Sequence, residues 1–215
     1  MELREQIDAV QQNILRMGAM VDTALRKTLA ALELQDFELA EQVIREDKRI
    51  DALQAAIEDQ CAAIIATAQP VGADLRQLLV GIKLASSLER TGDHARHLAR
   101  RARVVTDVLF VDALPLIRRM AEIDVSMLHD SLTAFVERDD RTAREIAARD
   151  DKIDALNAQL YTLIMAIMQT HPQTIEKAME LMLVNRFLER LGDHVTNICE
   201  WIVFAVRAEH IELNE

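Results

Sequence analysis

The 215-residue sequence has little of what interrupts a helix: it contains five glycines and three prolines, and aromatic residues make up only 3% of it. Alanine, leucine, isoleucine, glutamate and arginine are abundant instead. This composition is typical of long helices. The length suits one large domain or two small ones and is sufficient to bury a real core.

An excess of positive charge is also missing. The chain has 25 lysines and arginines against 36 aspartates and glutamates, a formal net charge of −11. Nucleic-acid binding requires a basic surface for phosphate contacts, so DNA or RNA is a poor candidate partner.

Cysteine motifs, a signal peptide and long apolar runs are absent as well. Cys61 and Cys199 stand in separate halves without CxxC spacing, which predicts reduced thiols in a cytoplasmic protein. Residues 1–5 lack the apolar core of a signal peptide, and no stretch approaches the roughly 18 apolar residues of a membrane span. We therefore expect a cytoplasmic protein that reaches a membrane only through partners.

One acidic heptapeptide occurs twice. LERTGDH at 88–94 recurs as LERLGDH at 188–194, an offset of 100 positions (188 − 88), with six of seven residues identical. At that offset the segments 74–87 and 95–104 contain no identities with their counterparts. Preservation of the motif alone between diverged copies indicates that chemistry is located there.

The repetition extends through most of each half. DKRIDAL at 47–53 recurs as DDKIDAL at 150–156, an offset of 103 (150 − 47), so each half is one structural unit. Apolar residues seven positions apart predict a coiled-coil-like seam in both units. The seam residues are Val43, Ile50, Ile57 and Ile64, matched by Ile146, Ile153, Leu160 and Ile167.

Breaks in the pattern divide each half into three helices. Asp36 and Asp139 can cap a following helix, and Pro70 and Pro172 can end one helix and start the next. The predicted fold is all-α, with two tandem antiparallel three-helix bundles, the repeats covering 1–106 and 107–215. The six helices are expected at 3–34, 37–68, 71–104, 113–137, 140–170 and 174–209, with a linker from Thr106 to Leu114.

Two acidic pairs in each half have i, i+4 spacing, which places both carboxylates on one helix face. In the first half the two pairs stand about 20 residues before and after the turn at Pro70, so the hairpin brings them level. The second half has the same arrangement around Pro172. Four carboxylates are thus expected to meet twice: Asp47, Asp51, Glu89 and Asp93, and then Asp150, Asp154, Glu189 and Asp193.

Four carboxylates this close together repel one another, so a positive charge must offset the repulsion. Carboxylate oxygens are suitable ligands for a hard or borderline cation: Mg, Mn, Fe or Zn. For an arbitrary acidic pair, a solvated face neutralised by neighbouring lysines and arginines is the ordinary interpretation. The twofold recurrence favours metal sites. Because Asp47, Asp51, Glu189 and Asp193 flank the apolar seam, the sites are expected to be open surface patches.

The neighbouring residues have subsidiary roles. Gly92 and Gly192 cost a helix about 1 kcal/mol each and allow close approach of a helix or a metal. His94 and His194 diverge by about 100° from the adjacent aspartates, which favours packing or hydrogen bonding over ligation. Asn197, or His97 at the matching place, is a candidate outer ligand.

These motifs resemble those of the PhoU family of phosphate-signalling regulators over nearly the whole chain. The resemblance rests on both ERxGDH elements, both DxxxD pairs and the turn Gln69–Arg76. It implies multinuclear metal clusters, with iron or zinc, on the eight carboxylates named above. Arg100 and His97 in the first repeat stand where the second has Glu200 and Asn197, which makes the first site the more doubtful one.

The resemblance also implies a function. Such a protein would be a homodimeric negative regulator of the phosphate regulon, coupling a phosphate ABC transporter and its ATPase to a sensor histidine kinase. No Walker loop, HExxH or GxSxG motif indicates an enzyme. The alternatives are a metal-free helical adaptor for another transporter, and a ferritin-like di-metal oxidase. The oxidase is disfavoured because no histidine follows a glutamate by three residues.

Overall fold

The computed structural model describes residues 2–102 and 108–213, which are helical and contain no strand. The α-helices are α1 (Leu3–Leu34), α2 (Phe37–Ala68), α3 (Gly72–Arg100), α4 (Leu114–Glu137), α5 (Asp140–Ala147), α6 (Asp150–Thr170) and α7 (Ile175–Arg207). Two 3₁₀ helices, η2 (Val108–Ala113) and η3 (Pro172–Thr174), precede α4 and α7. In the described residues, no helix is apolar over a length that would cross a bilayer.

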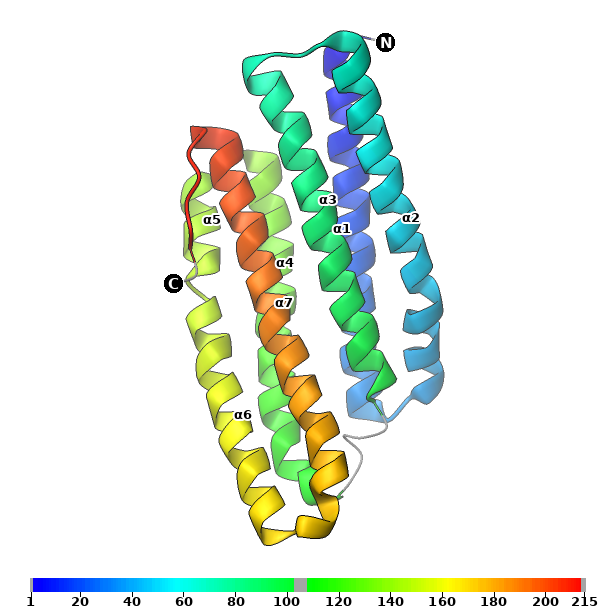
Figure 1. The fold of residues 1–215 in the computed structure, drawn as a ribbon, viewed down its shortest axis with the longest axis vertical. Helices are drawn as coiled ribbons and strands as arrows, with labels where there is room; N and C mark the ends of the chain where they lie inside the picture. Colours follow the sequence, from blue (N-terminus) through cyan, green and yellow to red (C-terminus); the bar gives the residue numbers. More distant parts are fainter. Residues whose placement is uncertain (1, 103–107, 214–215) are drawn as a thin grey trace.

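The helices form two antiparallel bundles, as Figure 1 shows, with α1 to α3 in one and α4 to α7 in the other. The all-α prediction of two tandem bundles is confirmed. Helices α3 and α7 lie side by side and run in opposite directions between the bundles. Arg101 pairs with Glu180 at 3.1 Å near one end of this contact, and Arg76 donates to the Ala205 carbonyl at 3.2 Å near the other.

Local sequence accounts for the turns of the first bundle. The Asp36 side chain accepts hydrogen bonds from the backbone N–H groups of Glu38 and Leu39 and so caps α2. At the next turn Gly72 has a φ of +58°, the left-handed region that glycine adopts without steric cost. The turn that contains Pro70 and Gly72 therefore reverses the chain where the sequence predicts.

The apolar seams are buried as predicted, except that Ile167 at the end of the second seam is only partly buried. Val43, Ile50, Ile57 and Ile64 are at most 5% exposed, and Ile146, Ile153 and Leu160 of the second bundle are fully buried. Burying such side chains contributes about 1.5–3 kcal/mol each, which holds both bundles together.

The predicted helix at 140–170 is wrong in one respect, because it is divided at Ala148 and Arg149 into α5 and α6. The backbone tightens there: Arg149 N–H donates to Ile146 O at 2.9 Å, and Lys152 N–H donates to Arg149 O at 3.0 Å. Alanine and arginine are good helix formers, so the local sequence gives no sign of a break. The Arg149 side chain instead contacts α4 through Asp130 and Ser126.

Other boundaries also differ from prediction. The third helix ends at Arg100, short of 104, and the last ends at Arg207, short of 209. Most of the described part of the predicted linker, Thr106 to Leu114, is the 3₁₀ helix η2. The predicted boundary between 106 and 107 lies outside the described residues.

The two motif glycines, Gly92 and Gly192, allow different side chains of the neighbouring helix to approach closely. A Cβ on Gly92 would lie 3.2 Å from Ile50 Cδ1, which is tight packing against α2. A Cβ on Gly192 would lie 2.1 Å from Asp150 Oδ1 and 2.9 Å from Ile153 Cδ1. Only glycine therefore leaves room for the Asp150 carboxylate at α7.

We expect Gly192→Ala to lower the free energy of unfolding by about 2 kcal/mol, because the new methyl group must displace the Asp150 carboxylate and Ile153. The matched variant Gly92→Ala is expected to stay within about 1 kcal/mol of wild type, since alanine's helix preference offsets the milder crowding. Urea denaturation measures both. Equal stability of the two variants would contradict the difference in packing.

Candidate functional site

The first acidic cluster forms where α2 packs against α3. Asp47 and Asp51 come from α2 and Asp93 from α3, and one oxygen atom from each lies within 4.8 Å of the others. Glu89 is close to them: burial raises its pKa, and the charges of Asp93, Asp51 and Asp47 raise it further. The turn thus brings the two predicted pairs of the first repeat together.

The expectation of an open surface patch is wrong for one carboxylate of each site. Asp51 and Asp154 are exposed and the motif carboxylates are partly buried, but Asp47 is only 4% exposed and Asp150 only 6%. The reason is heptad spacing: Asp47 falls between Val43 and Ile50, in the alternation of four and three residues that defines a helix seam. Each site therefore runs from the surface into the helix interface.

Arg96 was not identified from the sequence, although it neutralises the first cluster. Its guanidinium donates to Asp93 Oδ1 at 2.5 Å and pairs with Asp47 Oδ2 at 3.0 Å. Burial raises the pKa of Asp47, while the positive charge of Arg96 lowers it. The i, i+3 spacing of Asp93 and Arg96 is a signal for the first contact, but the contact with Asp47 depends on tertiary packing.

The second cluster has the same burial pattern and a different geometry. Burial raises the pKa of Glu189, and the nearby charges of Asp193 and Asp154 raise it further, so these carboxylates are neighbours. Among the described residues, however, carboxylate oxygens from three residues converge within 4.8 Å only in the first repeat. The residue equivalent to Arg96 is Thr196, which carries no charge.

Asp124 on α4 is a second residue that sequence reasoning missed. Its side chain is fully buried, and burial together with the charges of Asp150 and Asp193 raises its pKa well above the usual range. The burial of Asp124 could have been predicted from the sequence. Asp124 is four residues after Met120 and four before Leu128, so it lies on an apolar helix face. Helix α4, the first helix of the second bundle, thus contributes a carboxyl group near the acidic cluster.

The motif histidines serve the contact between bundles. The rings of His94 and His194 stack with centroids 5.2 Å apart, and His97 stacks on Phe187 at 4.9 Å. The pKa values of His94 and His194 are both lowered to about 4, mainly by burial and in part by the positive charge of Arg190. The neutral rings pack α3 against α7. The Asn197 amide donates to the Asp193 carbonyl at 3.0 Å.

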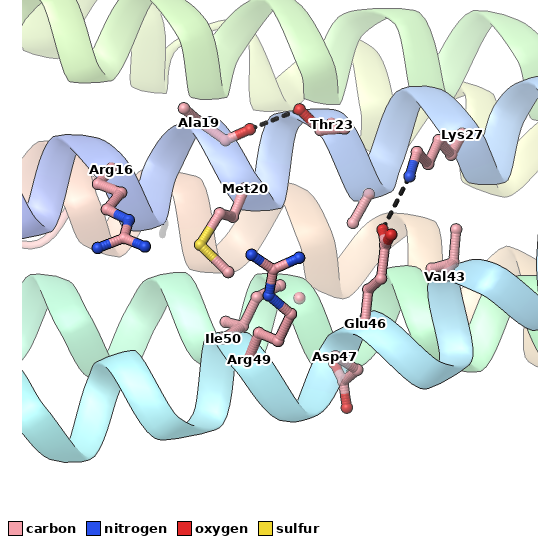
Figure 2. A pocket seen from close by; sticks show the side chains of 12 residues that line it. Arg16, Ala19, Met20, Thr23, Lys27, Val43, Glu46, Asp47, Arg49 and Ile50 are labelled. Atoms are coloured by element: carbon pink, nitrogen blue, oxygen red, sulfur yellow. Dashed lines mark hydrogen bonds and ion pairs between the residues drawn. The ribbon is translucent and has the colours of Figure 1, made fainter.

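A groove of about 400 Å³ lies between α1 and α2 beside the first cluster. Figure 2 shows Arg16 from α1 and Arg49 from α2 at this groove, with Lys27 held by Glu46 at 2.8 Å, while the Asp47 side chain points away. Neither histidine nor cysteine lines it. The groove carries positive charge and apolar surface, and it lacks the groups typical of a catalytic pocket.

The donor set of both clusters fits a metal ion. All eight predicted residues offer carboxylate oxygens, which are the ligands that hard cations prefer. The converging oxygens of the first cluster and the fully buried Asp124 beside the second are both places where positive charge would be stabilised. In the first cluster such an ion would compete with the guanidinium of Arg96.

Comparison with known proteins places both repeats in one family. The PhoU domain model matches residues 14–102 and 117–202. The phosphate-specific transport system accessory protein PhoU homolog of Clostridium acetobutylicum is 33% identical over 210 residues, covering 97% of this chain and 96% of that protein. PhoU of Escherichia coli is 31% identical over 208 residues, covering 97% and 86% respectively.

Solved structures agree with this relationship. The phosphate transport system regulatory protein PhoU from Streptococcus pneumoniae superposes with a TM-score of 0.91 at 29% identity, covering 98% of this chain and all (100%) of that one. PhoU from Pseudomonas aeruginosa gives a TM-score of 0.89 at 28% identity, covering 97% and 100%.

We expect Arg96→Thr, which copies the residue of the second repeat, to lower the free energy of unfolding by about 2 kcal/mol in metal-free buffer. The substitution leaves the buried Asp47 carboxylate without its cation. The control is Arg90→Ala, because Arg90 is largely exposed and lies 3.7 Å and 3.9 Å from Glu89 and Asp93. That variant should lose about 0.5 kcal/mol or less. Denaturation with EDTA present measures both, and equal losses would contradict a neutralising role for Arg96.

Proposed function

The chain belongs to the PhoU family, and on that premise we propose that it is a cytoplasmic negative regulator of phosphate transport and of the phosphate regulon. It would couple a phosphate ABC transporter, through its ATPase, to a sensor histidine kinase, and would approach the membrane only through these partners. The observation that carries the proposal is similarity over 97% of the chain to proteins named as accessory proteins of phosphate transport.

A role in binding suits the chemistry of the molecule better than catalysis. The groove between α1 and α2 is lined by both charged and apolar side chains, a mixture that is typical of a surface that binds a partner. The ferritin-like alternative requires histidines that point at the metal from Glu-x-x-His motifs. His94 and His194 instead stack on each other.

The acidic clusters are the proposed regulatory surface. The ligands would be Asp47, Asp51, Glu89 and Asp93 in the first repeat, and Asp150, Asp154, Glu189 and Asp193 in the second. A bound hard or borderline cation (Mg, Mn, Fe or Zn, in one or several copies) would neutralise these carboxylates. The residues would then hold α2 against α3, and α6 against α7, in one arrangement for a partner to recognise.

A metal-free helical adaptor for another transporter is the alternative. It is favoured in the first repeat by Arg96, which already supplies a positive charge to Asp47 and Asp93. An adaptor of that kind would keep the same melting temperature when Mn²⁺, Fe²⁺ or Zn²⁺ is added, because only ligands of the folded state stabilise it.

The regulatory role is tested by deleting the gene in its native host and following a phosphate-regulon reporter. Expression is expected to become constitutive in phosphate-rich medium, because the kinase is no longer held inactive. Reintroducing the wild-type chain should restore repression. A reporter that stays repressed in the deletion strain would exclude this chain as the regulator.

Metal binding is tested by elemental analysis of protein purified without chelators. We expect Glu89→Gln with Glu189→Gln to lose at least half of the bound metal, because one carboxylate is removed from each site. The control, Glu41→Gln with Glu176→Gln, removes two exposed glutamates away from the sites, one from each repeat, and should bind as wild type does. Finding no bound metal in the wild-type protein would contradict the metal-binding part of the proposal.

A further inference from the structure

The carboxyl group of Asp124 is the most isolated acidic group in the described chain. Its side chain is 0% exposed, and neither Oδ1 nor Oδ2 has a hydrogen-bond partner. A buried carboxyl group without a partner destabilises a fold, and it does so more strongly when it is ionised. Its presence at the centre of a bundle therefore points to a ligand that supplies what the protein does not.

The internal repeat locates this group against the second acidic cluster. Asp124 matches Val21 at the offset of 103 (124 − 103), and Val21 Cγ2 would lie 3.8 Å from a Cβ on Gly92. The counterpart of Gly92 is Gly192, where an added Cβ would lie 2.1 Å from Asp150 Oδ1. By this match Asp124 lies on α4 at the buried side of the second site, close enough for the charges of Asp150 and Asp193 to act on it.

The first repeat is the internal comparison, and its charge balance is different. There, apolar Val21 stands in place of Asp124, and Arg96 bridges Asp47 and Asp93. In the second repeat the counterpart of Arg96 is Thr196, whose buried hydroxyl oxygen has no hydrogen-bond partner. Relative to the first site, the second has gained a carboxyl group and lost a guanidinium group. A bound cation offsets both changes.

We propose that Asp124 is a fifth carboxylate ligand of the second site, at its interior end. This inference rests on the metal-binding part of the proposed function. The additional ligand causes the second site to bind a hard divalent cation more tightly than the first site does. Its oxygens extend the site into the core, away from water, where a cation and a carboxylate attract each other more strongly. In the first site, Val21 offers no ligand and Arg96 competes with a metal. The two repeats therefore differ in affinity although their surface motifs match.

The test measures Mn²⁺ binding to the full-length chain, with free Mn²⁺ followed by electron paramagnetic resonance. The parent protein for these measurements carries Asp51→Asn and Glu89→Gln. These substitutions weaken the first site, so that the second site accounts for most of the Mn²⁺ bound. Adding Asp124→Val, which copies Val21, is expected to raise the Kd for Mn²⁺ at least tenfold. The control Glu122→Gln removes an exposed carboxylate from the same helix and should leave the Kd unchanged.

Thermal melting gives a second readout, because the difference in melting temperature between Asp124→Val and its parent should change sign when Mn²⁺ replaces EDTA. In EDTA, Asp124→Val should melt above its parent, because an apolar side chain replaces a buried carboxyl group. In saturating Mn²⁺ the order should reverse, since the parent gains more from the bound ion. Asp124→Asn keeps one oxygen ligand and should have a Kd between the two.

The outcomes separate this inference from the function on which it rests. An Asp124→Val protein that is folded and binds Mn²⁺ as its parent does would overturn the role of Asp124 and leave the surface sites standing. An Asp124→Val protein that melts below its parent in EDTA would show a structural role without metal and would also overturn it. Absence of Mn²⁺ binding in the parent would overturn the second metal site and the inference together, and absence of binding in the wild-type chain as well would overturn both metal sites.

Discussion

The burial of aspartate in helix seams is the constraint on which the rest of this molecule depends. Asp47 and Asp150 occupy positions that the heptad spacing directs to the core, and the interior stabilises a carboxylate only beside a compensating group. Arg96 provides this compensation for Asp47. Asp150 requires space at Gly192, where no Cβ can be accommodated. The glycine at position 192 and the partner of Asp47 thus both follow from placing these two carboxyl groups between helices.

The two repeats meet this constraint differently although they share their motifs. In the first, a guanidinium group lies among three converging carboxylates. In the second, a short break between α5 and α6 precedes Asp150, and a further carboxyl group approaches from α4. Matching surface motifs thus cover interiors that differ in charge, because one holds a guanidinium group and the other holds an additional carboxyl group.

The acidic sites are also adjacent to the contact between the bundles. Asp93 and Asp193 each precede a histidine, and these two histidines stack across the contact between α3 and α7. Arg101 with Glu180 and Arg76 with Ala205 mark opposite ends of the same contact. The helices that carry the GDH motifs, α3 and α7, are therefore also the helices that join the two halves.

The sequence by itself determined the architecture of this protein: its helical composition, its two repeats, its turns at Pro70 and Pro172, and the eight carboxylates on facing helices. Periodicity and capping act over a few residues, so they can be read locally. Only the tertiary structure decided the division at Ala148, the close approach of Asp150 to Gly192, the contact of Arg96 with Asp47, and the position of Asp124 near the second site. Each depends on which side chains from distant helices share a buried space, where packing and the low dielectric outweigh local preference.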